Sequence, residues 1–323
     1  MTWFSFQFND FSLSFLSIVF EAVPYLILGT LISGFIDAFL PSKALERWLP
    51  KNPALAILIG GVLGFFLPMC ECGVIPVIRR MLRKGMPLAP AVTYLLASPI
   101  INPVVALSTY SAFRGQDPAT VLAFRFCLAF VIACVVGAIV LRLRKETILL
   151  PALLAPTGRR QNVFLQPAPD DSADLENLPV ATGKKLPLSG KLIAALRTAS
   201  FDFLDVAFYL VIGAALAALF NTSINREMVI LPLAQNIWLA TFSLQGLAML
   251  ISLCSTSDAF IAANFVAFPL SAKLAFMVLG PMMDVKLFFM YGLVFKKKFT
   301  VLLALGLFAG IGFLCIFLVP FLP

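Results

Sequence analysis

Residues 21–29, with the sequence EAVPYLILG, recur as residues 205–213, with the sequence DVAFYLVIG, 184 residues further along the chain. Both stretches place an acid, a tyrosine and a glycine at intervals of four residues, and both lie within apolar runs. The match predicts that the chain contains two copies of one structural unit.

Two further pairs of motifs follow in the same order. Cys70 corresponds to Cys254 at the same interval of 184 residues. Residues 98–102, SPIIN, correspond to residues 280–284, GPMMD, at an interval of 182 residues. A duplicated apolar unit with polar residues and helix breakers at matching positions is typical of transporters, whose binding site lies between the repeats.

The composition excludes an ordinary soluble domain. Of the 323 residues, 61% are hydrophobic and 12% are charged, with a mean hydropathy of +0.98, whereas soluble domains carry roughly 25% charged residues. A spanning helix needs roughly 20 apolar residues, so the sequence predicts a polytopic membrane protein. Because no basic leader precedes the first apolar segment, we expect that segment to be retained. Eight apolar segments occur, at residues 11–36, 54–69, 87–113, 119–141, 203–220, 237–253, 259–283 and 299–322.

The charged residues indicate topology rather than a nucleic-acid partner. The formal net charge is +8, but nearly all lysines and arginines flank apolar segments, as the positive-inside rule describes. The chain has no histidine, so any proton relay must use carboxylates or lysine. It has no glycine-rich phosphate loop, so we expect no ATP hydrolysis, and we also expect no cofactor and no enzymatic activity. The expected partners are the lipid bilayer and a small-molecule or ion substrate, and a homo-oligomer is left open.

The six cysteines lie within or at the ends of apolar segments. This placement argues against a secreted disulfide framework. Cys127, Cys134 and Cys315 are interpreted as packing residues, which leaves three cysteines as candidates for chemistry.

A hydrophilic stretch separates the two copies. Residues 144–197 are rich in proline, aspartate, serine and lysine, a composition that predicts a flexible linker. We therefore expect a first membrane repeat over residues 1–143 and a second over residues 198–323.

The second and sixth apolar segments are interrupted by polar residues. Residues 69–73 break the second segment and residues 254–258 break the sixth. The first arm of the second segment, at about 15 residues, would cover roughly 22 Å as a helix, and its return arm about half of that. These lengths favour a re-entrant helical hairpin, and a full crossing is the alternative.

The distribution of basic residues discriminates between the two arrangements. Eight spanning helices divide the flanking lysines and arginines 14 to 8 between the two sides, whereas two re-entrant hairpins divide them 19 to 3, the stronger bias of the kind that insertion produces. The sequence therefore predicts an all-α protein of two inverted repeats, each with three spanning helices and one re-entrant hairpin. The linker is then cytoplasmic and both termini lie outside.

The break in the second segment carries the first candidate site. Cys70, Glu71 and Cys72 place two thiols and a carboxylate in consecutive positions, and thiolates are preferred ligands of soft ions. A carboxylate within a membrane is costly unless it has a function, which favours a place on a permeation path. The alternative is that both cysteines are packing residues at a tight bend.

The matching turn of the second repeat holds Cys254, Ser255, Ser257 and Asp258. Inverted repeats would bring both turns to the bilayer midplane, and the thiols of Cys70, Cys72 and Cys254 would then form a candidate metal site. Free N–H groups at the start of each return arm suit anionic or electron-rich substrates. The alternative is that this polar run is simply a helix N-cap.

Further polar residues are candidates for coupling and binding. Asp284 is the preferred proton carrier, with Glu21 and Asp205 as further coupling candidates, because intramembrane carboxylates commonly mark proton relays. Asn102 corresponds to Asp284 in the motif alignment and is assigned to substrate binding. The alternatives are an internal ion pair for Asp284 and interhelical hydrogen bonds for Glu21 and Asp205.

Two basic residues lie inside apolar runs. Lys286 follows Asp284 by two residues, a spacing that points the two side chains to different faces of a regular helix, although a kink would allow them to pair. Arg125 lies early in an apolar run, and we expect its side chain to snorkel toward the membrane surface.

The set of motifs resembles the predicted permeases of the domain-of-unknown-function 318 type, which include organoarsenical efflux permeases. In that family the residue between the paired cysteines is often small and polar, so Glu71 departs from the pattern. The matching residues span both repeats: Pro68, Cys70, Cys72, Gly73 and Pro76; Ala97, Ser98, Pro99 and Asn102; Cys254 and residues 258–262; and Gly280, Pro281, Met282 and Asp284.

The resemblance implies a multi-pass permease of the bacterial inner membrane, with trivalent methylated arsenic as one substrate of the family. We expect a secondary-active, proton-coupled permease that exports a thiol-reactive metalloid or a soft metal ion, with coupling through Glu71, Asp258 or Asp284. Two alternatives are a membrane thiol redox protein, for which a spacing of one residue between the cysteines is unusual, and a membrane subunit that does not transport alone.

Overall fold

The computed structural model describes residues 8–39, 50, 52–115, 117–150, 188–223 and 236–317. Within these ranges the chain is helical, and its β structure is limited to an isolated bridge between Leu149 and Phe295. The all-α class is therefore confirmed for these residues. Residues 151–187, which hold most of the expected linker, lie outside the described residues.

The two halves contain helices in the same order. In each half a long helix is followed by two short arms, then by a broken pair of helices, then by a second long helix. The first half consists of α1 (Phe8–Phe39), α3 (Pro53–Phe66), α4 (Val74–Arg83), α5 (Leu88–Ala97), α6 (Pro103–Ala112) and α7 (Pro118–Leu141), followed by the short α8 (Lys145–Ile148). The second half consists of α10 (Leu188–Ser223), α12 (Ile237–Ile251), α13 (Asp258–Asn264), α14 (Leu270–Met282), α15 (Val285–Tyr291) and α16 (Lys297–Phe317).

The helices also pack in the same way within each half. Helix α5 contacts α3 and α7, and helix α14 contacts α12 and α16. Nearly every residue of α5 and α14 is buried, so each of these helices forms the centre of its half. The repeat boundaries expected from the sequence stay predictions, and α10 begins at Leu188, inside the range expected for the linker.

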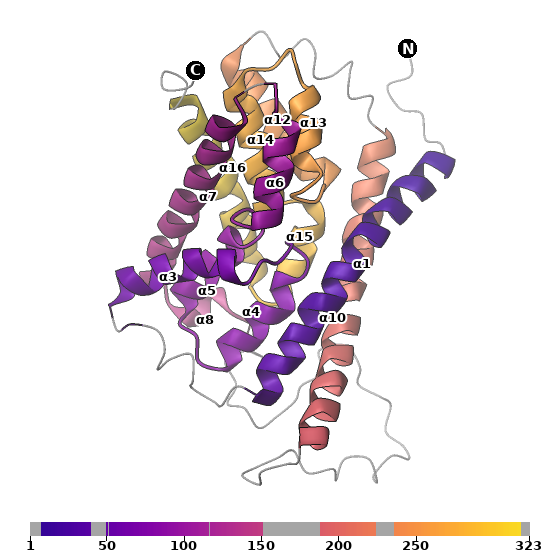
Figure 1. Cartoon of the computed structure of the whole chain (residues 1–323), viewed down its shortest axis with the longest axis vertical. Coiled ribbons are helices and arrows are strands. Elements are labelled where there is room, and N and C mark those ends of the chain that lie inside the picture. The colour runs from indigo at the N-terminus through magenta and orange to yellow at the C-terminus, as the bar shows by residue number, and fades with distance from the viewer. Residues whose placement is uncertain are drawn as a thin grey trace.

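The long helices α1 and α10 lie side by side and run antiparallel (Figure 1). Ser33 near the end of α1 donates a hydrogen bond to Asp202 in the first part of α10 at 2.8 Å, whereas Ile18 packs against Ala217 near the end of α10. At Gly34 a Cβ atom would lie 2.3 Å from the carbonyl oxygen of Ala195. The absence of a side chain there lets the two backbones touch.

The third apolar segment differs from the single spanning helix that the sequence favours. Helix α5 ends and α6 begins anew, because Asn102 caps α6 by accepting a hydrogen bond from the Val104 N–H at 2.9 Å and Pro103 occupies its first turn. Asp284 caps α15 in the same way, accepting from the Leu287 N–H at 2.7 Å. The repeated Pro-x-x-Asn/Asp motif thus marks a helix break in both halves.

The two interrupted segments are also broken where the sequence predicts. Helices α3 and α4 are separated by residues 67–73, and helices α12 and α13 by residues 252–257. Whether the two arms of each pair enter and leave the bilayer on the same side stays a prediction.

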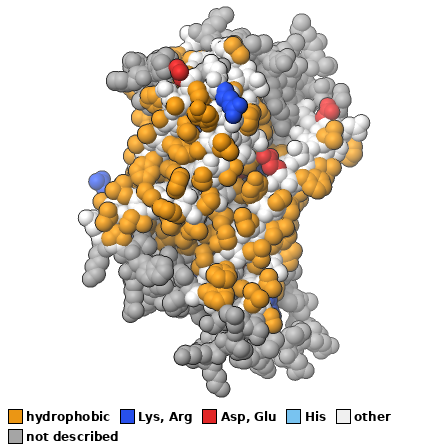
Figure 2. Space-filling model, in the orientation of Figure 1, with side chains coloured by type: hydrophobic (Ala, Val, Ile, Leu, Met, Phe, Trp, Pro, Cys, Tyr) orange, Lys and Arg blue, Asp and Glu red, His pale blue; other side chains and the backbone are white. Residues whose placement is uncertain are grey.

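The exposed surface suits a lipid environment. Hydrophobic side chains cover most of the described part of the face shown in Figure 2, and exposed residues include Phe20 on α1 and Leu302 on α16. Among the described residues, the helical stretches long and apolar enough to cross a membrane are Phe8–Phe39, Pro118–Leu141, Leu192–Phe220, Lys297–Phe317 and Leu270–Tyr291, the last of which consists of α14 and α15 together. The several long apolar helices therefore indicate a multi-pass membrane protein.

Candidate substrate site between the two halves

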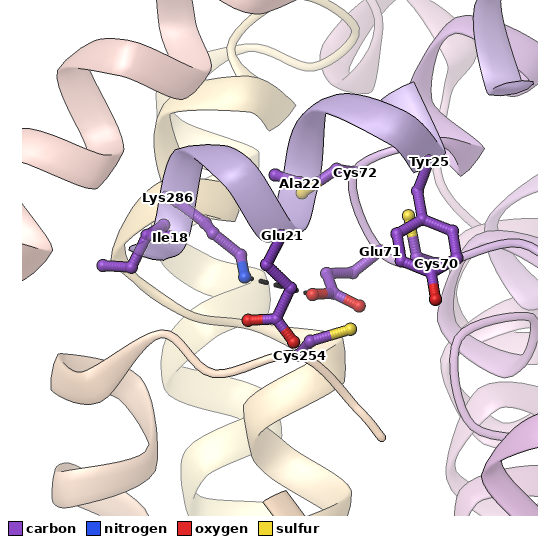
Figure 3. Close-up of a pocket in the computed structure, with 9 residues that line it drawn as sticks. All are labelled: Ile18, Glu21, Ala22, Tyr25, Cys70, Glu71, Cys72, Cys254 and Lys286. Atoms are coloured by element: carbon purple, nitrogen blue, oxygen red, sulfur yellow. Dashed lines mark hydrogen bonds and ion pairs between the residues drawn. The ribbon is translucent and has the colours of Figure 1, made fainter. Parts of the chain in front are cut away.

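A small pocket lies where the two halves meet (Figure 3), with an empty volume of about 210 Å³ that includes the open space at its mouth. Helix α1, the α3–α4 turn, the α12–α13 turn and helix α15 form its wall. It combines thiols, carboxylates and an ammonium group from both halves. The lining residues are Ile18, Glu21, Ala22, Tyr25, Cys70, Glu71, Cys72, Cys254 and Lys286.

The α3–α4 turn is held by its own backbone and by α1. The Gly73 N–H donates to Cys70 Sγ at 3.2 Å, and the Val74 N–H donates to the Cys70 carbonyl oxygen at 3.1 Å. A Cβ atom added at Gly29 of α1 would lie 2.4 Å from the Gly73 carbonyl oxygen. The glycine of the repeated motif therefore allows α1 to close one side of the pocket.

The α12–α13 turn begins at Ser252, whose φ of 54° lies in the left-handed region. The N–H groups of Ser257 and Asp258 both donate to the Cys254 carbonyl oxygen at 3.0 Å. The Ser257 hydroxyl donates to Glu21 Oε1 at 2.8 Å and makes no side-chain cap bond on α13. Ser257 therefore occupies the N-cap position of α13, as the alternative has it, but its side chain links the turn to α1 instead of capping the helix.

Lys286 is the ammonium group at the base of the site. Its Nζ atom donates to Glu71 Oε1 and to the Ser252 carbonyl oxygen, at 3.0 Å each, and lies 3.4 Å from Asp284 Oδ2. Lys286, Glu71 and Asp284 are each no more than 3% exposed. Gly213 allows this geometry, since a Cβ atom there would lie 2.5 Å from the Lys286 Cα atom.

Sequence reasoning did not assign Lys286 to the site. Residues two positions apart point to different faces only within a regular helix. Asp284 is the N-cap residue and lies outside the helix that contains Lys286, so this rule does not apply to the pair. The kinked alternative, an internal ion pair between the two, is what the structure has. The available signal was a lysine deep in an apolar run, which requires a buried partner.

Arg125 does not snorkel, and that expectation was wrong. Its side chain is fully buried, with Nη2 within 2.9 Å of both oxygens of Asp258 and 3.1 Å from the Ser255 carbonyl oxygen. Its Nη1 donates to Thr109 Oγ1 at 2.8 Å. A guanidinium whose partners lie inside the fold has no reason to reach the membrane surface.

The structure brings some of the candidate residues together and separates others. Glu21, Cys70, Glu71, Cys72 and Cys254 line one pocket, and Ser257 and Asp284 contact pocket residues. The other four candidates lie elsewhere: Asn102 caps α6, Asp205 pairs with Arg79 at 3.1 Å, and Ser255 and Asp258 contact Arg125. The parts of all these candidates in binding or coupling stay predictions.

The three thiols share the pocket without forming a ready metal site. They are free cysteines, but in the part of the chain that the structure describes, no group of three or more histidine, cysteine, aspartate or glutamate side chains is placed to hold a metal ion. Metal binding by Cys70, Cys72 and Cys254 therefore stays a prediction.

A second set of ionic contacts ties α4 to both long helices. Arg80 donates to both oxygens of Asp202 at 3.0 Å and lies 3.3 Å from Asp37. Arg79 pairs with Asp205. Both arginines are buried. They were counted as charges that flank an apolar segment, and in the structure they also hold α4 against α1 and α10.

The comparison with known families fits this architecture. The family model ArsP_1, described as a predicted permease, matches residues 7–320. The chain belongs to this family. The resemblance drawn from the cysteine and proline motifs is confirmed, and a permease family accounts for the apolar surface and the internal pocket better than an enzyme family does.

Curated relatives of the chain include one whose name describes a permease subunit. The UPF0718 protein YcgR of Bacillus subtilis is 37% identical over 290 residues, covering 90% of each chain. A Streptococcus mutans protein with the provisional name two-component membrane permease complex subunit is 32% identical over 286 residues, covering 88% of this chain and 87% of that protein. The UPF0718 protein MJ0584 of Methanocaldococcus jannaschii is 30% identical over 108 residues, or 33% of this chain and 28% of that protein. No solved structure matches the chain.

Proposed function

We propose that this permease is a secondary-active transporter of the bacterial inner membrane that exports a small thiol-reactive solute through the pocket between its halves. One observation supports the proposal above all others. The pocket wall joins Cys70 and Glu71 of the first half to Cys254 and Lys286 of the second. Transporters built from repeats hold their substrates at the repeat interface.

We propose an inverted relation between the halves, with α3–α4 and α12–α13 as re-entrant hairpins and the linker in the cytoplasm. The antiparallel packing of α1 and α10, which begin the two halves, supports inversion. The irregular backbone of both turns lines a pocket, which is where such backbone is tolerated at membrane depth.

Alternating access would then come from movement of one half against the other. Ion pairs join the halves alongside apolar packing such as that of Ile18 against Ala217, and the ion pairs, being directional, favour a small number of discrete arrangements over a continuous slide. The ion pairs that join the first half to the second are Arg79–Asp205, Arg80–Asp202, Arg125–Asp258 and Glu71–Lys286.

The proposed substrate class follows from the thiols. Cysteine sulfur binds soft species, whereas oxygen ligands suit hard cations. Trivalent arsenic, inorganic or methylated, fits this chemistry and agrees with the family resemblance, and soft metal ions are the competing class. Proton coupling is proposed through Glu71, Glu21 or Asp284, which lie at or beside the pocket, rather than through Asp258, which Arg125 holds on both oxygens.

A flux panel in sealed proteoliposomes tests the proposal. Arsenite, methylarsenite, Zn²⁺ and Cd²⁺ are offered to the wild type and to the variants Cys70→Ser and Glu71→Gln, with Cys127→Ser as the matched control because Cys127 is exposed on α7. We expect transport of at least one of these solutes, its loss in both pocket variants and its retention in the control. Absence of flux for every solute would contradict the proposal.

A second candidate is that the chain transports only as part of a complex. The name of the Streptococcus mutans relative describes a subunit of a two-component membrane permease complex. Co-purification from the native membrane followed by reconstitution with and without the recovered partner distinguishes the two: flux from the chain alone favours the first candidate, and flux that requires the partner favours the second.

A further inference from the structure

We infer that Lys286 is a built-in cation that occupies the place of a soft divalent ion, so that the pocket excludes Zn²⁺ and Cd²⁺ and accepts soft solutes without a net positive charge. The inference rests on the proposed transport function and narrows its substrate class.

The groups around the pocket would otherwise suit a soft dication. Three thiols and the carboxylates of Glu21 and Glu71 line it, and the Asp284 carboxylate lies just beyond Lys286. Sulfur ligands supplemented by carboxylate oxygen are the donors that Zn²⁺ accepts in proteins. Lys286 is the basic residue among the pocket-lining residues.

The ammonium group itself contacts two of those carboxylates. Its nitrogen contacts Glu71 Oε1, the Ser252 carbonyl oxygen and Asp284 Oδ2 within 3.4 Å. These three oxygens could equally serve as ligands of a metal cation. Within the described residues, no group of such side chains is placed to hold a metal ion, although the thiols and acids share one pocket. A dication entering beside Lys286 would meet a fixed positive charge in a region of low dielectric.

One acceptor remains for the substrate. Glu71 is 2% exposed, and its Oε2 atom has no hydrogen-bond partner. Figure 3 shows one oxygen of this carboxylate turned to Lys286 and the other turned away from it, among the side chains that line the pocket. An unpaired buried acceptor is costly, so a bound solute that donates a hydrogen bond there while its soft atom meets a thiol satisfies both groups.

The test measures Cd²⁺ binding by the purified full-length protein, by calorimetry and by thermal unfolding. Lys286→Leu and Lys286→Gln remove the charge without adding sulfur, and Lys286→Arg retains it. Lys273→Leu is the matched control, because Lys273 is a buried lysine of α14 that does not line the pocket. The double variant Glu71→Gln/Lys286→Leu removes both members of the ion pair.

We expect both neutral variants to bind Cd²⁺ at least about tenfold more tightly than the wild type, because an adjacent positive charge has been removed. The wild type, Lys286→Arg and Lys273→Leu should bind weakly, and the double variant should lose most of the gain. If a neutral variant is folded only with Cd²⁺ present, the ion has replaced the ammonium group as counter-ion, which supports the inference.

Two results would overturn the inference. One is wild-type binding of Cd²⁺ in the pocket as tight as that of Lys286→Leu. The other is that neither neutral variant gains affinity for Cd²⁺. This includes the case in which both variants stay folded and bind no better than the wild type, and the case in which they are unfolded both with and without Cd²⁺. Binding is read without flux, so a wild type that transports no thiol-reactive solute refutes the proposed function alone.

Discussion

At the scale of single residues, the interior of this permease is organised by buried charges that find partners in the other half of the chain. Arg125 pairs with Asp258 and Lys286 pairs with Glu71, at distances of 2.8 and 3.0 Å. Removing one partner of such a pair leaves an uncompensated charge, which is far more damaging than removing both.

Arg125→Met should therefore lower the free energy of unfolding by about 3–5 kcal/mol, since it strands Asp258 in the core. Thermal or denaturant unfolding in detergent measures the change. Arg125→Met/Asp258→Asn should recover much of the loss, and Arg114→Met, at an exposed position, should change stability by about 0.5 kcal/mol or less. A single variant as stable as the wild type would refute the structural importance of this pair.

Glu21 and Asp205 occupy equivalent positions in the two copies but differ in their surroundings. Glu21 lines the pocket and accepts from Ser257, whereas Asp205 pairs with Arg79 and its side chain is 39% exposed. Glu21→Gln should slow proton-coupled flux at least about tenfold with little loss of stability. Asp205→Asn should cost about 1 kcal/mol or less, because its ion pair is partly solvated, and should leave flux intact. Equal flux for the two variants would contradict this asymmetry.

The sequence predicted which residues gather at the turns but not how they are paired. Cys70, Glu71 and Cys254 stand out because polar residues interrupt apolar runs there. The partner of Glu71 is 215 residues away in the chain, and tertiary packing alone determines which cation reaches it. The side chain of Arg125 was wrongly expected at the membrane surface for the same reason, because the sequence does not show that Asp258 lies close enough to pair with it inside the fold.

At the scale of helices, glycines determine how closely the elements approach the pocket. Gly29 brings α1 onto the α3–α4 turn, and Gly213 brings α10 onto α15 at Lys286. Both glycines belong to the repeated motif from which the duplication was predicted. The motif therefore reflects one packing requirement that both halves share, the close approach of a long helix to a neighbouring backbone, which is the α3–α4 turn for Gly29 and helix α15 for Gly213.

Gly29→Ala should destabilise the protein by about 1–3 kcal/mol, the usual cost of overpacking, because the new methyl group would lie 2.4 Å from a carbonyl oxygen of the turn. Gly306→Ala in α16 is the control, since a Cβ atom there meets nothing within 4 Å, and it should be neutral or stabilising by up to about 1 kcal/mol. Thermal unfolding of the two variants gives the comparison. Equal stability would show that α1 does not rest on the turn.

The helix breaks were partly predictable. Polar residues interrupt the apolar runs at residues 69–73 and 254–258, which predicts a helix break at each place, and the structure has breaks at both. The break between α5 and α6 was missed because proline can also kink a continuous spanning helix. Asn102 decides the outcome by capping a new helix, and whether a side chain caps or faces a neighbour depends on the packed structure.

At the scale of the whole molecule, two halves with the same helix order meet along α1 and α10, and the pocket lies in their interface. Composition and periodicity were enough to predict the all-α membrane class, because the bilayer restricts spanning structures so strongly. Which side of the membrane each helix end faces is determined during insertion, and labelling of single cysteines measures it.

Single cysteines placed at Arg83 and at Lys297, in a background without other reactive thiols, should both react with an impermeant reagent from the cytoplasmic side only. The re-entrant arrangement puts the ends of α4 and the start of α16 on the side that carries most of the basic residues. Reaction of the two positions from opposite sides would instead support eight full crossings.

The most direct test of the central claim compares flux of methylarsenite into sealed vesicles for the wild type, Cys254→Ser and Cys127→Ser. The pocket between the halves is the proposed site, so Cys254→Ser should reduce the initial rate at least about tenfold while Cys127→Ser leaves it unchanged. Equal rates for all three proteins, with flux clearly above that of empty vesicles, would place the transport path elsewhere and contradict the account.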